Sequence, residues 1–278
     1  MFARPGPALP ERARRLASAA MRSRKTRRAS ACKEFTPLLA GGDPSQAALL
    51  ELSLLKACRH PHVAPVRALL ARGPAWYLVT DLAPLGSWDA RLKQQPQEPG
   101  QRHDMLLRFA LQTASGMAYL HSRRVAHCNL KPQNLLVAPG EGVLLTDYGL
   151  SHLLPPQAQA ARAAHWSCAY MAPEARQVLA GAGGGELTPA ADVWSFGVCI
   201  GQALMRGEYP APPGSLAPGS LQVQPFSPQE IGASDGPRAL QAVYRACLVT
   251  LPAQRPRFDL LVKELQRAAK ELCAGVLG

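Results

Sequence analysis

The sequence has few aromatic residues, no long hydrophobic run and no segment with the apolar core of a signal peptide. Aromatic side chains make up 6% of the 278 residues. The longest apolar run, around Phe196–Met205, contains Gly201 and Gln202. It is shorter than the roughly 20 residues that a transmembrane helix needs. These absences exclude a transmembrane bundle, and the composition also excludes collagen, a coiled coil and a small secreted disulfide-rich domain.

The cysteines form no closely spaced pair. None of the seven belongs to a Cys-x-x-Cys motif, so we expect no zinc site. An odd, dispersed set without a secretion signal is typical of reduced thiols, which indicates the cytoplasm or the nucleus. The cysteines are Cys32, Cys58, Cys128, Cys168, Cys199, Cys247 and Cys273.

Most of the net charge of +12 lies near the N-terminus. Residues 1–32 contain nine Lys or Arg and one acid, whereas the rest contains 22 basic and 18 acidic residues. Residues 1–28 lack a face that could pack, so we interpret them as a basic, disordered arm. An arm of this composition also resembles a mitochondrial transit peptide or a contact for an anionic surface. We therefore expect a cytoplasmic protein, with nuclear or mitochondrial alternatives.

The pattern downstream predicts two lobes, a small strand-rich one over 29–84 and a helical one over 85–274. Strands are expected at 30–35, 63–70 and 75–80. One helix is expected between them, beginning with a capping box at Asp43. In the second lobe we expect a strand pair, an irregular stretch at 150–186 and a surface loop at 207–235. Its strands are expected at 135–137 and 143–146, and its helices at 105–120, 190–205, 240–248 and 258–272. The predicted fold class is α+β.

Seven short motifs follow one another in a fixed order. They are Cys32-Lys33, Glu51, His127–Asn134 (HCNLKPQN), Asp147-Tyr148-Gly149, Ala172-Pro173-Glu174, Asp192–Gly197 (DVWSFG) and Arg255. Each motif alone is weak, but their order and spacing resemble the eukaryotic protein-kinase fold over about residues 30–272. The helix region LLELSLLKACRHPHV is similar to tyrosine-kinase-like families.

The resemblance assigns the polar members of these motifs to nucleotide chemistry. It implies that Lys33 holds the α- and β-phosphates of ATP and pairs with Glu51. Asn134 and Asp147 are implied ligands of Mg²⁺, a hard cation that prefers oxygen donors. Lys131 is implied to contact the γ-phosphate, as in similar Ser/Thr kinases.

Other implied roles concern the adenine pocket and the packing between the lobes. The resemblance places the adenine between Ala31 and Leu136, Thr80 at the back of the pocket, and residues 81–83 as the hinge. It also implies an apolar column anchored by Asp192, in which His127 is a core residue and not a base. Glu174 and Arg255 are expected to form a buried ion pair. The column residues are Leu55, Val66, His127 and Tyr148.

Asn129 departs from the family pattern at the catalytic position. The family has an aspartate here that accepts the proton of the substrate hydroxyl. The neutral amide of Asn129 has the same shape, but its nitrogen accepts no proton. General base catalysis contributes about 10²–10⁴ in rate, so we expect impaired phosphotransfer. Positioning and metal electrostatics carry most of this reaction, so the loss of the base leaves residual transfer open to the remaining groups.

The glycine-rich phosphate loop is also missing. The only glycine before Lys33 is Gly6, and residues 8–28 lack the alternation that a hairpin needs. A backbone cradle for phosphate requires glycine. We therefore expect weak or lost binding of ATP and Mg²⁺. A natural isoform with a replaced first segment would give the same pattern.

Cys128 is a third departure. The family has an arginine here, which pairs with a phosphorylated residue of the activation loop. Ser151, Ser167 and Tyr170 are candidate phosphate acceptors in this sequence, but Cys128 removes that contact. A packed, inert thiol is the preferred interpretation of Cys128.

The sequence thus predicts a pseudokinase, a kinase-like domain that acts as a scaffold or allosteric partner with weak ATP binding. The alternative is a slow but active Ser/Thr protein kinase. A protein partner or protein substrate is expected in either case. Binding of nucleic acid by the basic arm is a third, less favoured reading, since the arm has no aromatic residue apart from Phe2. The oligomeric state is not predicted.

Overall fold

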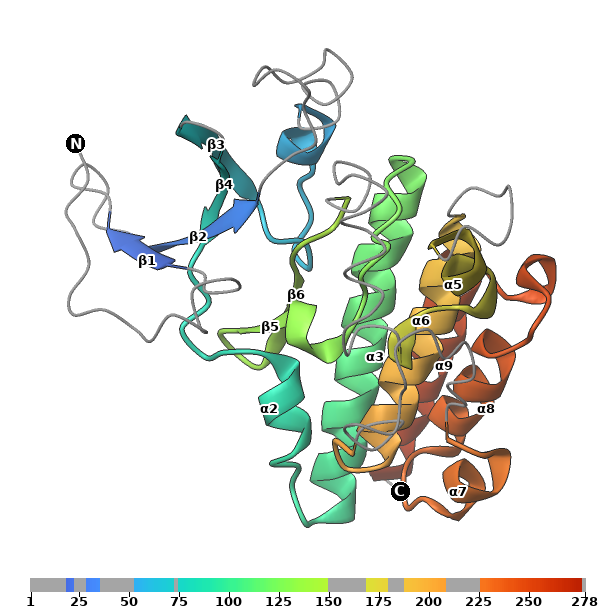
Figure 1. Ribbon diagram of the computed structural model, residues 1–278. Coiled ribbons are helices and arrows are strands. Elements are labelled where there is room, and N and C mark those ends of the chain that lie inside the picture. Colours follow the sequence, from blue (N-terminus) through green and yellow to red (C-terminus); the bar gives the residue numbers. More distant parts are fainter. Residues whose placement is uncertain are drawn as a thin grey trace.

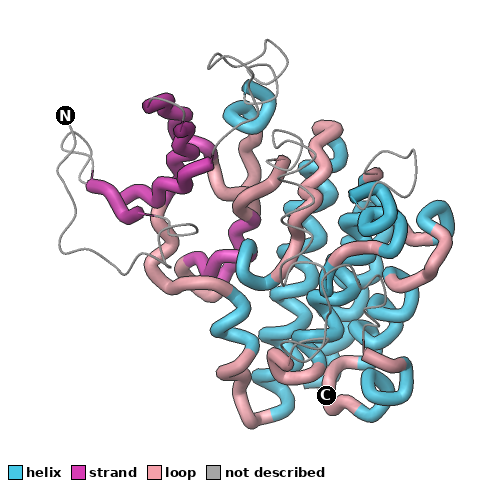
Figure 2. Tube along the Cα trace, in the orientation of Figure 1, coloured by secondary structure: helices cyan, strands magenta, loops and turns pink. Residues whose placement is uncertain are grey.

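A computed structural model describes the protein over residues 19–22, 29–35, 53–72, 75–149, 169–179, 188–208 and 226–276. The chain forms a small, sheet-containing lobe and a larger helical lobe (Figure 1). Figure 2 shows most strands on one side of the molecule and most helices on the other. This arrangement is the α+β two-lobed fold that the sequence predicts.

The small lobe contains a four-stranded antiparallel sheet in the order β1-β2-β4-β3. The predicted strands at 30–35, 63–70 and 75–80 correspond to β2, β3 and β4. Apolar and β-branched runs between proline and glycine favour such strands. Strands β2 and β4 each pair on both sides, so they form the centre of the sheet, and β1 and β3 form its edges. The strands are β1 (Ala19–Arg22), β2 (Ala29–Phe35), β3 (Val66–Arg72) and β4 (Ala75–Asp81).

Strand β1 corrects the prediction that residues 8–28 form no hairpin strand. It pairs with β2 in a register that places Ala19 opposite Cys32 and Arg22 opposite Ala29. Four residues are too few for a periodic pattern to stand out in the sequence. The hydrogen bonds to β2 stabilise this strand, although the local sequence has no strand pattern.

The segment after the first helix joins the two lobes. Residues 53–57 are helical, as predicted, whereas the expected capping box at Asp43 lies outside the described residues. Ala64 N–H donates to the Leu145 carbonyl at 2.8 Å, and Leu145 N–H donates to the His62 carbonyl at 2.9 Å. These two bonds attach the segment to the strand that precedes Asp147.

Helix α3 (Pro99–Ser122) is the central helix of the second lobe. It begins six residues before the predicted start, because Pro99 takes the first helical position and Glu98 caps the free amides. The Glu98 carboxylate accepts from Gly100 N–H at 3.0 Å and from Gln101 N–H at 2.6 Å. The short helix α2 (Trp88–Leu92), which the sequence did not predict, precedes it.

The remaining predicted helices are present, and they pack around α3. Helix α6 is buried along almost its whole length, as an apolar helix without a polar face must be. Helix α9 covers α3, and α8 packs against α6. Strands β5 and β6 form the predicted hairpin. The bounds are α6 (Pro189–Leu204), α8 (Arg238–Cys247), α9 (Phe258–Val276), β5 (Leu135–Ala138) and β6 (Gly142–Leu145).

Two short helices lie where the sequence predicted irregular structure. Helix α5 (Pro173–Leu179) falls in the 150–186 stretch, and α7 (Pro228–Ala233) falls in the predicted loop. Helix α7 has a complete capping box between Ser227 and Glu230, a signal that the proline- and glycine-rich surroundings concealed. No helix in the described residues is long and apolar enough to span a bilayer.

Candidate functional site

Strand β2 positions the first two candidate binding residues. Lys33 lies opposite Leu78, and Ala31 lies opposite Thr80 in the register of β2 with β4. The structure describes this strand by its backbone. Glu51 lies outside the described residues, so its pair with Lys33 remains a prediction.

The hinge region begins where β4 ends. Thr80 is buried, with 8% of its surface exposed. The next residue, Asp81, accepts two hydrogen bonds from the guanidinium of Arg67 on β3, at 2.9 and 2.5 Å. This pairing fixes the start of the predicted hinge.

Strand β5 approaches the chain just after the hinge. Leu136 is half-buried and forms a bridge with Ser87, and Val137 N–H donates to the Gly86 carbonyl at 2.9 Å. Leu136 therefore lies at the junction where the resemblance places the adenine. The adenine contacts of Ala31 and Leu136 remain predictions.

The predicted catalytic loop is held by its backbone. Asp192 of α6 is buried, and its carboxylate accepts from His127 N–H and from Cys128 N–H, each at 2.8 Å. Cys128 has a φ of 56°, a conformation that costs a non-glycine residue free energy. The two hydrogen bonds that Asp192 accepts offset that cost and hold the turn before Asn129 and Lys131.

His121 is a member of this cluster that the sequence reasoning missed. Its Nε2–H donates to the Asp192 carboxylate at 2.9 Å, and its ring packs edge-on against Phe258. Burial opposes ionisation of Asp192, but the bonds and positive charge from His121, together with the His127 amide, lower the pKa of this carboxyl. Nothing in the spacing from His121 to Asp192 signals the contact.

His127 is a core histidine, as the sequence indicated. It is fully buried, and neither ring nitrogen has a hydrogen-bond partner among the described residues. Burial lowers the pKa of His127 because the protein interior disfavours the imidazolium ion. The other predicted column members, Leu55, Val66 and Tyr148, are also buried.

The two candidate metal ligands flank the β5–β6 hairpin. Thr146 N–H donates to the Asn134 carbonyl at 3.0 Å, which places Asn134 beside the residue that precedes Asp147. The Asn134 side-chain amide donates from Nδ2 to the Asn129 carbonyl at 2.8 Å. This bond fixes the amide so that its oxygen remains available.

An amide oxygen and a carboxylate in this arrangement suit a hard divalent cation. Asp147 has a φ of 63°, which aspartate tolerates better than most residues. The residues present therefore fit Mg²⁺. No group of three or more His, Cys, Asp or Glu side chains in the described part of the chain could hold a metal by itself. The phosphates of a nucleotide would complete the coordination.

The predicted ion pair between Glu174 and Arg255 is present. The Arg255 guanidinium donates to both carboxylate oxygens, at 2.6 and 2.9 Å, and its side chain is fully buried. It also donates to the Ala190, Val249 and Thr250 carbonyls and lies over the Trp194 ring. This pair holds α5 against the end of the helical lobe.

Of the three candidate phosphate acceptors, Tyr170 does not fit that role. It is 3% exposed, and its hydroxyl donates to the Gln202 side chain at 2.5 Å. A hydroxyl in this position is inaccessible to another active site. Ser151 and Ser167 lie outside the described residues.

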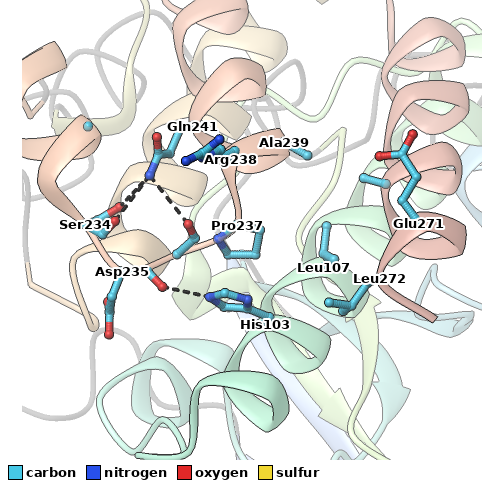
Figure 3. A pocket seen from close by; sticks show the side chains of 13 residues that line it. His103, Leu107, Ser234, Asp235, Pro237, Arg238, Ala239, Gln241, Glu271 and Leu272 are labelled. Carbon is cyan, nitrogen blue, oxygen red and sulfur yellow. Dashed lines mark hydrogen bonds between the residues drawn. The ribbon is translucent and has the colours of Figure 1, made fainter. Parts of the chain in front are cut away.

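A hollow of about 580 Å³ lies away from these motifs, among α3, α8 and α9 (Figure 3). His103 donates to the backbone carbonyl of Asp235 at 2.7 Å, and Gln241 donates to the carbonyls of Ser234 and Gly236. None of the predicted site residues lines this hollow. The His103 bond fastens the loop before α8 to α3, and the Gln241 bonds fasten the same loop to α8.

Comparison with known proteins agrees with the motifs. A family model described as protein tyrosine and serine/threonine kinase matches residues 17–265. The human non-receptor tyrosine-protein kinase TNK1 is 32% identical over 235 residues, which are 81% of this chain and 33% of that protein. Mouse protein-tyrosine kinase 6 is 28% identical over 220 residues, 77% of this chain and 46% of that protein.

Human tyrosine-protein kinase Srms is 33% identical over 165 residues, 58% of this chain and 32% of that protein. The chain thus spans less than half the length of these curated relatives. The match to the family model includes strand β1 and every motif from Lys33 to Arg255. The chain belongs to the protein tyrosine and serine/threonine kinase family.

Proposed function

We propose that this kinase domain has impaired phosphotransfer, binds ATP with Mg²⁺ weakly, and acts chiefly through a protein partner. The observation that carries the proposal is Asn129. The loop around it is built as a catalytic loop should be, with its turn anchored by Asp192 and its carbonyl bound to Asn134. A neutral amide therefore stands at the end of an otherwise ordered loop.

Each retained group supports nucleotide binding more than chemistry. Asn134 and Asp147 would hold the metal, and Lys33 with Lys131 would neutralise phosphate charge. The metal, when bound, would draw charge from the phosphate oxygens. Asn129 can orient a hydroxyl by hydrogen bonding, but it takes up no proton. The acceptor's proton would then pass to water or to the phosphate itself, which slows transfer.

The nucleotide part is tested by thermal unfolding of the wild-type chain in millimolar ATP, with and without Mg²⁺ or Mn²⁺. A ligand that binds only the folded state raises its stability by mass action. We expect a small, metal-dependent rise in melting temperature that Lys33→Ala and Asp147→Asn each abolish. An unchanged melting temperature under every condition would contradict nucleotide binding.

The alternative function is a slow protein kinase. The ordered metal-ligand pair and the retained Lys131 favour it. Lys131 is typical of Ser/Thr kinases, whereas the relatives named above are tyrosine kinases, so both acceptor classes belong in the assay. Phosphate incorporation that disappears in Asp147→Ala would support this alternative over the scaffold.

The Asn129→Asp variant separates the two defects. If the missing base limits the rate, restoring it should raise incorporation by about 10²-fold or more. Asn129→Ala serves as the matched control, because it removes the amide without adding a base. No gain from Asn129→Asp would instead assign the defect to the missing glycine-rich loop.

We do not expect regulation through the family's arginine, which pairs with a phosphorylated activation-loop residue, because Cys128 replaces it. Cys128 offers no cation to a phosphorylated residue, so phosphorylation of Ser151 or Ser167 should not order the catalytic loop through this position. Phosphomimetic Ser151→Asp and Ser167→Asp should leave ATP binding unchanged. A clear gain in either variant would require another basic partner.

A further inference from the structure

The hydroxyl of Tyr148 makes a bond that the apolar column does not require. Tyr148 stands between Asp147 and Gly149, and it is 3% exposed. Its hydroxyl donates to the Ala64 carbonyl at 2.8 Å. A buried phenol finds a partner because an unpaired hydroxyl is costly in the interior. The packing role of the ring alone would be served equally well by phenylalanine.

Ala64 is itself fixed to the strand before Asp147. Its N–H donates to the Leu145 carbonyl, and its carbonyl accepts from Tyr148. Leu145 lies two residues before Asp147, and Tyr148 lies one residue after it. Ala64 is therefore hydrogen-bonded to the chain on both sides of Asp147, at Leu145 before it and at Tyr148 after it. These two hydrogen bonds to one residue hold the backbone segment that contains Asp147.

Gly149 closes the other side of Asp147. It has a φ of 69°, and a Cβ added there would lie 2.6 Å from Leu55 Cδ2. Leu55 belongs to the helical residues 53–57 and is buried. Any larger residue at this position would therefore collide with the helix. Asp147 itself has a φ of 63°, in the left-handed region.

We propose that the Tyr148 hydroxyl is a positioning group, which holds the backbone of Asp147 in its metal-binding orientation through the Ala64 carbonyl. Displacing Tyr148 would leave two buried polar groups unpaired, because Ala64 is only 3% exposed. The hydrogen bond from Tyr148 to Ala64, called the lock below, thus gives Tyr148 a role beyond the packing role that the sequence assigned to it. It rests on the proposed function for the role of Asp147.

The test compares Tyr148→Phe with Tyr170→Phe in the full chain. Both changes remove one hydroxyl from a buried tyrosine, but Tyr170 bonds to Gln202 in the helical lobe. The first measurement is amide hydrogen exchange without nucleotide. We expect exchange at Ala64 and Leu145 to become about tenfold faster in Tyr148→Phe, relative to core amides of α6. We expect Tyr170→Phe to leave that ratio unchanged.

The second measurement is ATP affinity with and without Mn²⁺. We expect Tyr148→Phe to reduce the metal-dependent part of the affinity several-fold and to leave metal-free affinity unchanged, since only the metal ligand is displaced. Unchanged exchange at Ala64 and Leu145 would overturn the lock. Faster exchange with an unchanged metal-dependent affinity would overturn the positioning role and leave a structural bond.

Failure of the proposed function gives a different result. In that case the wild-type chain shows no metal-dependent ATP affinity at all. The exchange ratio at Ala64 and Leu145 still decides whether the hydroxyl holds Asp147. The exchange measurement therefore distinguishes failure of the hydrogen-bonded lock from failure of the proposed function.

Discussion

The carboxylate of Asp192 holds Cys128 in a left-handed backbone conformation by accepting its amide at 2.8 Å. The same carboxylate accepts from His127 N–H and from His121. One buried side chain thus fixes the turn that leads into the predicted catalytic loop. All three groups named here donate to Asp192, so the side chain at this position must offer acceptor oxygens and no donor.

Asp192→Asn should therefore destabilise the domain although it changes only one atom. The new NH₂ group would face a backbone N–H and leave a buried donor unpaired, at a cost of about 3 kcal/mol. Urea denaturation would measure the free energy of unfolding. Asp104→Asn, at a carboxylate with 58% of its side chain exposed, should change it by about 0.5 kcal/mol or less. Equal effects of the two variants would refute the anchoring role.

Arg255→Met should destabilise the domain by about 3–5 kcal/mol. The change leaves Glu174 without its cation and three carbonyls without their donor. The double variant Glu174→Leu with Arg255→Met should recover part of the loss, since it removes both charges. Denaturant midpoints would show this. Glu264→Ala breaks an exposed pair with Arg267 and is the control, expected within about 0.5 kcal/mol.

Stability should fall as the pH drops below about 6.5, the ordinary pKa of histidine. Burial lowers the pKa of His127, and burial with the neighbouring His62 lowers the pKa of His60. Below this pH the two histidines bind protons in the unfolded chain more readily than in the folded chain, so acidification favours unfolding. The stability contributed by the neutral rings is present above pH 6.5 and lost below it.

Unfolding of wild type and His127→Phe at pH 7.5, 6.5 and 5.5 would measure this dependence. The fully buried His127 contributes up to about 1.4 kcal/mol per pH unit in that window, and the partly exposed His60 contributes less because solvent screens it. The free energy of unfolding should fall less steeply with decreasing pH in His127→Phe than in wild type. It should fall less steeply still in the double variant His127→Phe with His60→Asn. Parallel slopes for all three proteins would contradict the assignment.

Gly116→Ala should destabilise the domain, although alanine normally favours a helix by about 1 kcal/mol. A Cβ at Gly116 would lie 2.9 Å from the His62 carbonyl oxygen, which is backbone and is already bonded to Leu145. We expect a net loss of about 1–3 kcal/mol. Gly232→Ala is the matched control, because a Cβ there meets only Arg245 at 3.7 Å. Thermal unfolding should show opposite signs for the two variants.

The sequence predicted the elements whose patterns are long or sharply bounded. Apolar periodicity located α3, a continuous apolar run located α6, and the turn at 139–142 between two short apolar runs located the β5–β6 hairpin. Strand β1 and helix α5 were missed because each is stabilised mainly by its neighbours. Helix α7 has a capping box, Ser227 with Glu230, in its sequence. The surrounding proline- and glycine-rich residues nevertheless favoured the prediction of a loop.

The candidate site was predicted from motif order, the roles of its residues from the resemblance to the kinase family, and the expected defect from the residue type at Asn129. Spacing placed Asn134 and Asp147 at the two ends of one hairpin, where the structure has them. The bonds from His121 to Asp192 and from Tyr148 to Ala64 join residues far apart in the chain. Both follow from tertiary packing, so no local pattern could reveal them.

Helix α3 packs against α9, the last helix of the described chain. During synthesis α3 emerges long before α9, so the part of its apolar face that α9 covers stays exposed until that helix arrives. Non-local contacts of this kind slow folding and leave hydrophobic surface exposed in intermediates. Newly made chains of this protein should therefore depend on chaperones until Phe258–Val276 has left the ribosome. Chains that lack α9 should aggregate even though every motif of the candidate site is present.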